Sequence, residues 1–255
     1  MINDILCLSP KEMPDLVLQK ISRFDEKTEL PVRKLSAKEI LYIFKCMNGF
    51  WTYAYQLAKN GKVGKHAELK SKRHSDGFLN SKMVLNYHNL RWIIAWQLFL
   101  LYKRLNLTMP NYVVGVPTGA SELGKDVAQL MHAKNVTMEK QNGKIKLISS
   151  LEKGKTVLLV EDFCTKGTGF KEAVHILKQS DPEVNIIPYE LVVINRGGLK
   201  KIEANATDKF KITALSDHRI NDWHPSECPL CKMGSIPIKP KVSKESWIEL
   251  TTSQL

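Results

Sequence analysis

Two acidic residues and a loop of small residues follow an apolar run, and together they could bind a phosphorylated sugar. Residues 156–160 are mostly aliphatic, as in a buried strand of a parallel sheet. Glu161 and Asp162 come next, followed by the loop 165–169 and a helical pattern over 170–179. Backbone N–H groups at a helix start, together with loop hydroxyls, can bind a phosphate. The acids would then lie beside it, where carboxylates can hold ribose hydroxyls.

The alternative for this segment is a plain strand-to-helix turn whose acids cap the helix. Other phosphate-binding motifs do not compete, because the chain has neither G-x-x-x-x-G-K-[ST] nor G-x-G-x-x-G. Residues 156–169 resemble the phosphoribosyl pyrophosphate (PRPP) motif of type I phosphoribosyltransferases, in which an acid pair precedes a T-x-G-T-like loop. The resemblance implies catalytic roles for Asp162 and Glu161. It also implies a PRPP-binding loop made of Thr165, Lys166, Gly167, Thr168 and Gly169, with Lys166 departing from the small residue that is commoner there.

A second turn with small side chains follows the strand predicted over 112–116. Its sequence is PTGAS, residues 117–121, and such a turn lets backbone amides approach a ligand closely. It resembles the pyrophosphate loop of the same family, which implies that Thr118, Gly119 and Ala120 bind PRPP. The alternative is an ordinary turn, but its distance ahead of the PRPP motif matches the order of motifs in the family.

A lysine-bearing segment, EKQNGKIK at residues 139–146, lies where the family has a mobile loop over the active site. The resemblance implies that Lys140 is catalytic and reaches the pyrophosphate, with Lys144 and Lys146 as helpers. Cations in a closed site stabilise the charge on a leaving pyrophosphate. The alternative is an exposed hairpin that turns at Asn142 and Gly143 and carries ordinary surface lysines.

Two further segments resemble orotate phosphoribosyltransferases and imply the base. Residues 67–80 are similar to a stretch that forms a hood over the base, with Lys70 touching orotate and pyrophosphate and Phe78 lying against the base. Lys72 replaces the family glycine there. Residues 195–198 resemble a D-R-G-G turn in which Arg196 would bond the pyrimidine, and arginine offers fixed donors for a planar acceptor edge. Asn195 replaces the family aspartate.

The fold class follows from strands and helices that alternate along the chain. Strands are expected over 112–116, 136–138, 156–160 and 186–194, with helices over 84–105, 122–132 and 170–179. This order predicts a doubly wound parallel α/β sheet with its ligand beyond the carboxyl ends of the strands. The resemblance implies a type I phosphoribosyltransferase core over about 84–215, with a small hood from 60–82 and 216–245. Residues 36–255 would form this single domain and residues 1–35 an N-terminal extension.

An amphipathic helix is predicted from Ser36 to about Lys59. Ser36 and Glu39 form a capping-box pattern, and apolar residues recur at helical spacing from Ile40 to Trp51. We interpret that stripe as core or as the surface of a homodimer.

Cys228 and Cys231 form a C-x-x-C motif that invites a zinc interpretation. His218 and His224 are near in sequence, but their spacing and their order before the cysteines fit no common zinc finger. A reduced structural pair is therefore favoured over metal binding or redox activity, and no protein metal ligand is assigned.

Composition limits the partners. The 38 basic and 26 acidic residues give a net charge of +12, which suits a polyanionic ligand, RNA or an acidic membrane surface. The basic residues form no block, so nucleic acid is disfavoured, and the apolar segment 92–102 is too short to span a bilayer. The N-terminus lacks a secretory pattern and the five cysteines are an odd number, so a cytoplasmic location is expected.

The resemblance implies an enzyme that uses Mg²⁺ to transfer the phosphoribosyl group of PRPP to orotate, giving orotidine 5′-monophosphate and pyrophosphate. Mg²⁺ would be held mainly by PRPP, and a homodimer is expected. The alternatives are a phosphoribosyltransferase for another nitrogenous base, and a noncatalytic PRPP or nucleotide sensor on the same fold.

Overall fold

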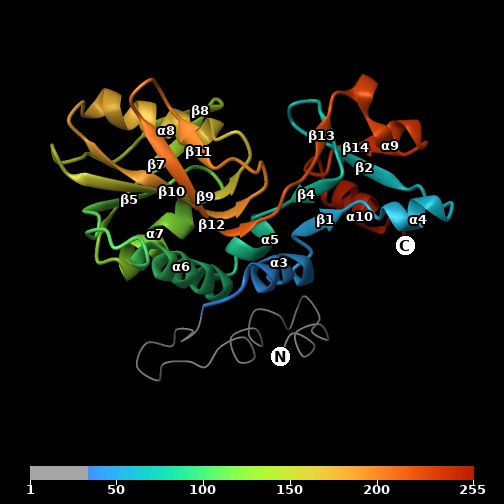
Figure 1. Ribbon diagram of the computed structural model, residues 1–255, viewed down its shortest axis with the longest axis horizontal. Helices are drawn as coiled ribbons and strands as arrows, with labels where there is room; N and C mark the ends of the chain where they lie inside the picture. The colour runs from blue at the N-terminus through green and yellow to red at the C-terminus, as the bar shows by residue number, and fades with distance from the viewer. Residues whose placement is uncertain (1–33) are drawn as a thin grey trace. The chain divides into compact units, whose positions relative to one another are not determined.

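The chain divides into two units, which we call the large unit and the small unit. A computed structural model describes residues 34–255, so the predicted N-terminal extension lies almost wholly outside the described residues. The large unit comprises the described residues up to Met47 together with Ser81–His218, and the small unit comprises Asn48–Asn80 and Arg219–Leu255 (Figure 1). Each unit has its own sheet.

A six-stranded sheet forms the centre of the large unit and confirms the predicted fold class. Its order is β11-β12-β10-β9-β5-β6, parallel except for β11. The strands are β5 (Tyr112–Gly115), β6 (Lys134–Val136), β9 (Thr156–Cys164), β10 (Asn185–Asn195), β11 (Lys201–Glu203) and β12 (Lys209–Asp217). From β5 the chain moves outward to β6, and from β9 it moves outward the other way. The switch point therefore lies between β5 and β9, where a ligand is expected at the carboxyl ends.

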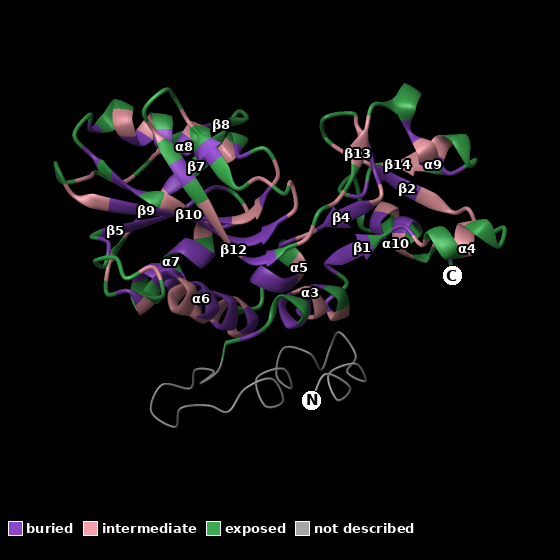
Figure 2. Cartoon of the chain, in the orientation of Figure 1, coloured by how far each residue is buried: buried purple, intermediate pink, exposed green. Residues whose placement is uncertain are grey.

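Helices and a hairpin cover the two faces of this sheet. One face carries α3 (Ala37–Cys46), α5 (Lys82–Leu85), α6 (His88–Lys103) and α7 (Ser121–Leu130) (Figure 1). The other carries α8 (Thr168–Ser180) and the hairpin of β7 (Met138–Gln141) and β8 (Lys144–Leu147). The central strands are buried along most of their length (Figure 2).

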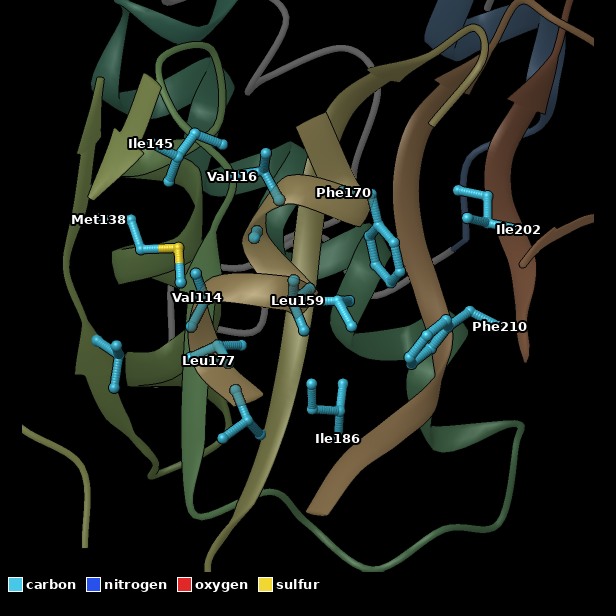
Figure 3. Close-up of a cluster of buried hydrophobic side chains, with 14 of the residues drawn as sticks. Val114, Val116, Met138, Ile145, Leu159, Phe170, Leu177, Ile186, Ile202 and Phe210 are labelled. Carbon is cyan, nitrogen blue, oxygen red and sulfur yellow. The ribbon is translucent and has the colours of Figure 1, made fainter. Parts of the chain in front are cut away.

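Apolar side chains fill the layer between the sheet and α8. Figure 3 shows this cluster, in which the rings of Phe170 and Phe210 lie edge to face at 5.0 Å between centroids. Met138 and Ile145 of the hairpin belong to the same cluster. Burial of such side chains contributes on the order of 2 kcal/mol each, so the hairpin is a packed part of the unit.

The predicted helix from Ser36 to Lys59 is wrong in its extent. Its capping box is present, since the Ser36 hydroxyl accepts from the backbone N–H of Glu39 and the Glu39 side chain bonds back to Ser36. The helix nevertheless ends at Cys46, and Asn48 takes a left-handed φ of 52° ahead of Gly49. Asn-Gly is a turn signal that outweighs the helical spacing of the apolar residues.

The apolar stripe is core within the large unit as far as Met47. Ile40, Ile43, Phe44 and Met47 are all at most 2% exposed, and the Phe44 ring lies 5.6 Å from that of Phe163. The stripe therefore offers no surface for a homodimer.

The small unit is built from two segments that are distant in sequence. Its main sheet has the order β13-β3-β2-β14, and a separate pair joins β1 to β4. The strands are β1 (Phe50–Thr52), β2 (Lys65–Glu68), β3 (His74–Ser75), β4 (Gly77–Leu79), β13 (Asp222–Trp223) and β14 (Ile236–Ile238). The helices are α4 (Tyr55–Lys59), α9 (Pro229–Lys232) and α10 (Lys244–Thr252), with a 3₁₀ turn at Pro225–Glu227.

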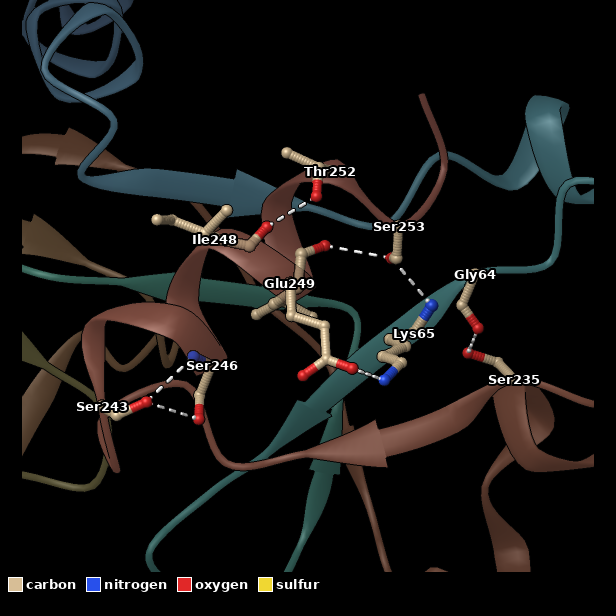
Figure 4. Close-up of polar contacts among 10 residues, drawn as sticks. Gly64, Lys65, Ser235, Ser243, Ser246, Ile248, Glu249, Thr252 and Ser253 are labelled. Atoms are coloured by element: carbon tan, nitrogen blue, oxygen red, sulfur yellow. Dashed lines mark hydrogen bonds and ion pairs between the residues drawn. The ribbon is translucent and has the colours of Figure 1, made fainter.

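Polar contacts fasten the end of the chain to β2 in this unit. The backbone N–H of Lys65 donates to the Ser253 hydroxyl over 2.9 Å, and the Lys65 ammonium pairs with Glu249 (Figure 4). The Ser235 hydroxyl donates to the Gly64 carbonyl over 3.1 Å (Figure 4). The two segments are thus joined by side chains as well as by strand pairing.

Candidate active site

Asp162 connects the acid pair to the PTGAS turn. The strand β9 runs to Cys164, so both acids lie inside the strand near its carboxyl end, and not after its end as predicted. The Asp162 carboxylate accepts from the backbone N–H of Phe163 over 2.8 Å. It also lies directly against Gly119, where a Cβ would come within 1.9 Å of Oδ2. Because Gly119 has no Cβ, the PTGAS turn after β5 can approach the Asp162 carboxylate of β9 closely.

Glu161 has different surroundings, because neighbouring residues of a strand point to opposite faces. It is 8% exposed, and its carboxyl lies with the Glu190 carboxyl and the Cys164 thiol in one buried group. Burial and the neighbouring Glu190 raise the pKa of Glu161 well above its usual range. Burial likewise raises the pKa of Glu190. The pair is therefore protonated more readily than ordinary carboxyls, and a shared proton lets one carboxyl donate to the other.

Sequence reasoning missed Glu190. It lies in the middle of β10 and is fully buried. A single acid inside the apolar run of residues 186–194 was the available signal, since a lone buried carboxyl needs a partner.

The predicted phosphate loop leads directly into α8. Gly167 has φ 64° and caps the helix, which begins at Thr168. The positive φ favours glycine at this position, and a Cβ there would come within 2.3 Å of the Ile202 side chain, which would have to shift. The first N–H groups of a helix have no partner within it, so those at the start of α8 are available to an anion.

Lys166 does not crowd this loop. Its side chain is exposed and lines a pocket of about 560 Å³ together with Lys171 and Lys201. The departure from the family pattern therefore adds a cation beside the loop without filling it.

The turn after β10 packs onto the phosphate loop. The Arg196 guanidinium donates from Nε to the Thr165 hydroxyl over 2.6 Å. The backbone N–H groups of Arg196 and Gly197 both donate to the Cys164 carbonyl, over 2.9 and 3.1 Å. Arg196 is thereby brought to the same edge of the sheet as the acids and the phosphate loop.

Asn195 has a structural partner that explains why it replaces the family aspartate. It is buried, and its amide donates to the Asp217 carboxylate over 2.7 Å and to the Leu199 carbonyl over 2.8 Å. Its Oδ1 accepts from the backbone N–H of Gly198 over 3.2 Å. An aspartate at 195 could donate to neither of these acceptors, and it would set a second carboxylate against that of Asp217.

The PTGAS turn is tight. The peptide bond between Pro117 and Thr118 is cis, and the Ala120 N–H donates back to the Val116 carbonyl over 3.2 Å. Thr118 is exposed and Gly119 half-buried, whereas the Ala120 side chain is fully buried. Any contact of Ala120 with a ligand would thus be through its backbone.

The lysine segment is a hairpin, as in the alternative weighed for it. Asn142 and Gly143 form its turn with φ of 51° and 82°. Lys140 is paired with Ile145, and Ile145 is buried, with its N–H donating to the Glu172 carboxylate over 2.7 Å. Directly paired residues of antiparallel strands share a face. Lys140 therefore projects from the face that packs on the core.

Lys144 and Lys146 project from the opposite, solvent-facing side of the hairpin, since side chains alternate along a strand. All three lysines are exposed. Only the position of Lys140 distinguishes it from an ordinary surface lysine.

The remaining predicted site residues belong to the small unit. Lys70 is exposed in the turn between β2 and β3. Lys72 has φ 64°, and its N–H still donates to the Leu69 carbonyl over 2.9 Å, so the turn survives without the family glycine. Phe78 is 8% exposed, with its ring 5.8 Å from that of Trp247. Phe78 is therefore a core residue of this unit, and this placement gives its predicted contact with a base no support.

A family model decides the relationship of the chain. Residues 94–227, more than half of the sequence, match the model described as the phosphoribosyl transferase domain. The chain belongs to the phosphoribosyltransferase family.

Curated relatives of this phosphoribosyltransferase are named orotate phosphoribosyltransferases. The chain is 29% identical over 188 residues to the protein of Caldicellulosiruptor bescii, covering 73% of this chain and 93% of that one. It is 30% identical over 177 residues to the protein of Caldicellulosiruptor saccharolyticus, covering 69% and 87%.

Solved structures overlap the chain more loosely. Leishmania donovani UMP synthase has a TM-score of 0.47 at 16% identity and covers 76% of this chain and 40% of that one. Orotate phosphoribosyltransferase from Aeropyrum pernix has a TM-score of 0.46 at 18% identity and covers 63% and 93%. At this degree of overlap they add nothing to the assignment. Among the described residues, every helix is too short or too polar to cross a membrane.

Proposed function

We propose that this phosphoribosyltransferase joins orotate to PRPP, producing orotidine 5′-monophosphate and pyrophosphate. The observation that carries the proposal is the contact between Asp162 and Gly119, which unites the acid strand and the PTGAS turn at the switch point of the sheet. The start of α8 and Arg196 lie at the same edge. An acid, two anion-binding turns and a cation suit PRPP, a sugar that carries both a 5′-phosphate and a pyrophosphate.

Each element has a role in this reaction. The loop 165–169 binds the 5′-phosphate, and this remote binding energy helps to orient the reacting carbon. Asp162 holds ribose hydroxyls and stabilises the positive charge that develops on the ribosyl ring as its bond to pyrophosphate loosens. Glu161, whose raised pKa favours the neutral form, serves as a hydrogen-bond donor. Thr118 and Gly119 bind the departing pyrophosphate, and Lys140 neutralises it.

The half-buried carboxylate of Asp162 is an oxygen ligand of the kind Mg²⁺ accepts, so the site fits the ion that the family implies. Mg²⁺ would be held mainly by the diphosphate, with Asp162 beside it. When bound, it neutralises charge on the leaving group.

Orotate is favoured over other bases by the names of the relatives and by the cations assigned to the base. Lys70 suits an anionic carboxylate, and Arg196 suits a planar acceptor edge. Lys72 and Asn195 depart from the family pattern, but each fits its surroundings in this structure. Neither departure therefore argues for a different base. Arg196 also donates a hydrogen bond to Thr165 in the phosphate loop. Its loss should therefore weaken the binding of PRPP as well as the binding of the base.

The proposal is tested by offering bases to the purified full chain. Orotate, uracil, hypoxanthine, guanine, adenine and nicotinate would each be supplied with PRPP and Mg²⁺, and pyrophosphate release recorded. Release with orotate supports the proposal. Release with a purine only would mean a transferase for another base, and PRPP binding without release from any base would mean a sensor. The homodimer and the cytoplasmic location stay predictions, the first to be checked by sedimentation.

A further inference from the structure

Four metal-ligating side chains converge in the small unit, outside the site described above. The atoms His66 Nε2, His74 Nδ1, Cys228 Sγ and Cys231 Sγ all lie within 4.8 Å of one another. Nε2 of His66 is 3.1 Å from Nδ1 of His74, and it is 3.7 and 3.6 Å from the sulfurs of Cys228 and Cys231. Nδ1 of His74 is 3.2 Å from the Cys231 sulfur. We propose that these four residues bind a structural zinc ion.

The four nitrogen–nitrogen and nitrogen–sulfur separations above match a tetrahedral zinc centre. Bonds of about 2.0 Å to nitrogen and about 2.3 Å to sulfur place nitrogen pairs about 3.3 Å apart and nitrogen–sulfur pairs about 3.5 Å apart. Two imidazoles with two thiolates are a set that favours zinc over hard cations. All four positions are protein atoms, so the site is closed and stabilises structure without taking part in catalysis.

The local fold presents the ligands from two directions. His66 lies on β2 and His74 on β3, which form an antiparallel hairpin. Cys228 caps α9 and Cys231 lies within it, so one helical turn brings both sulfurs to the same side. Gly234, with φ 88°, then turns the chain into β14, which pairs in parallel with β2.

Ser235 fixes the tautomer that His66 needs for metal binding. Its hydroxyl donates to the Gly64 carbonyl over 3.1 Å (Figure 4). With that proton used, the same oxygen accepts from Nδ1–H of His66 over 2.9 Å. Nε2 of His66 therefore carries a lone pair and faces the other three ligands. A hydrogen-bonded second nitrogen is the usual support of a metal-binding histidine.

A bound cation would also give these buried polar side chains a common partner. His66, His74 and Cys228 are buried, at 0%, 6% and 0% exposed. Without an ion, one proton shared between His66 Nε2 and His74 Nδ1 can satisfy the two imidazoles, but both sulfurs are left with only weak hydrogen-bonding capacity, whereas an ion would be bound by all four atoms.

The histidines considered from sequence are not the ligands. His224 bonds through Nδ1 to the Ser226 hydroxyl over 2.7 Å, and His218 belongs to the large unit. The partners His66 and His74 flank the hairpin turn that carries Lys70.

A bound metal ion would stabilise the small unit, which is small for an independently folded unit. Units of roughly 70 residues rarely obtain enough stability from one hydrophobic core and often add a metal. Its core cluster is small, with Trp51, Tyr53, Ala67, Phe78, Cys228, Leu230, Trp247 and Leu250 as its buried members. The proposed ion would join the hairpin of the first segment to the C-x-x-C of the second.

The test measures metal in the purified full chain. Zinc content should be about one ion per chain, and Co²⁺ added to the chelated, reduced protein should give the visible and near-ultraviolet bands of a tetrahedral thiolate site. Cys228→Ser with Cys231→Ser should abolish both signals. Cys46→Ser and His224→Ala, which leave the four ligands intact, should keep them.

Two further measurements test the zinc site even if the double cysteine variant does not fold. Ser235→Ala should retain the ligands but bind zinc about 10- to 100-fold more weakly. Thiol alkylation with mass spectrometry should find both cysteines reduced. The proposal would be overturned by unmodified protein that takes up neither Zn²⁺ nor Co²⁺, by a Cys228–Cys231 disulfide, or by full metal content in the double cysteine variant.

Discussion

Asp162 and Glu161 are adjacent in sequence but differ in burial and in their neighbours, and this difference separates their roles. Asp162 is half-buried against the PTGAS turn, where a carboxylate can meet a developing positive charge. Glu161 is buried beside Glu190, and its pKa is raised mainly by that burial. The two acids of the motif are therefore not interchangeable.

We predict that Asp162→Asn lowers kcat by about 10²- to 10³-fold, because it removes charge that stabilises the transition state. Glu161→Gln should cost less, since an amide still donates a hydrogen bond. Steady-state pyrophosphate release measures both. Glu152→Gln, on an exposed acid, is the control and should leave kcat unchanged. Near-normal turnover by the Asp162 and Glu161 double variant would contradict the assignment.

Glu190→Gln should stabilise the protein at neutral and alkaline pH. A carboxyl with a raised pKa in the folded state binds more protons there than when unfolded, so its contribution to stability falls as pH rises above the ordinary carboxyl pKa. The amide removes this loss and can donate to Glu161. We expect a gain on the order of 1 kcal/mol at alkaline pH and less near the ordinary carboxyl pKa.

Urea unfolding at several pH values measures this gain. The exposed acid Glu122 provides the control, since Glu122→Gln should leave the pH dependence as it was. A Glu190→Gln variant that lost stability most at high pH would show that the buried pair does not hold an extra proton.

Lys72→Gly should stabilise the small unit by about 0.5–1 kcal/mol. Lys72 has φ 64°, a conformation that costs a side chain roughly 1–2 kcal/mol and glycine little, partly offset by glycine's freedom in the unfolded chain. The free energy of unfolding is the measurement. Lys244→Gly, in the helix α10, should be destabilising. Equal losses in both variants would mean that the left-handed turn at Lys72 is absent.

At the scale of elements, the β7–β8 hairpin presents its lysines unequally. Lys140 shares the core-packed face with Ile145, whereas Lys144 lies on the outer face. We predict that Lys140→Ala lowers kcat about 10- to 100-fold, as for the loss of one charged hydrogen bond, and that Lys144→Ala changes it less than twofold. Single-turnover kinetics with PRPP would separate chemistry from binding. A larger effect at Lys144 would reverse the assignment.

The sequence predicted the strands that carry the proposed site because each is apolar and each ends in a recognisable turn. It predicted poorly where a short turn interrupts a longer pattern, as at Asn48 and Gly49, or where apolar spacing alone set a boundary, as at the end of β9. Contacts between distant segments, such as His66 with Cys231, leave no periodic signal. The parallel pairing of β14 with β2 brings these segments together, and a one-dimensional pattern does not predict that pairing.

At the scale of the whole molecule, the two units should unfold separately once metal is removed. Structural zinc contributes to folding free energy directly, and the proposed ligands all lie in the small unit. We predict one main calorimetric transition with zinc, and an added transition at lower temperature after chelation. Restoring zinc should remove the added transition.

Limited proteolysis locates the unit that melts first. Chelated protein should be cut within Asn48–Asn80 and Arg219–Leu255 before the large unit is cut. The Cys46→Ser variant, which leaves the four ligands intact, should respond to chelator as the unmodified protein does. Identical melting with and without chelator would contradict the prediction.

The discontinuous small unit also affects biosynthesis. Its first segment ends at Asn80 and its second begins at Arg219, so roughly 140 residues of the large unit are translated between them, which takes about 7–28 s at usual elongation rates. During that interval β2 has left the ribosome without β14, and His66 and His74 have no cysteines beside them. The nascent hairpin is thus exposed to misfolding and to chaperones until the last segment emerges, and zinc supply at that moment would govern the yield of native protein.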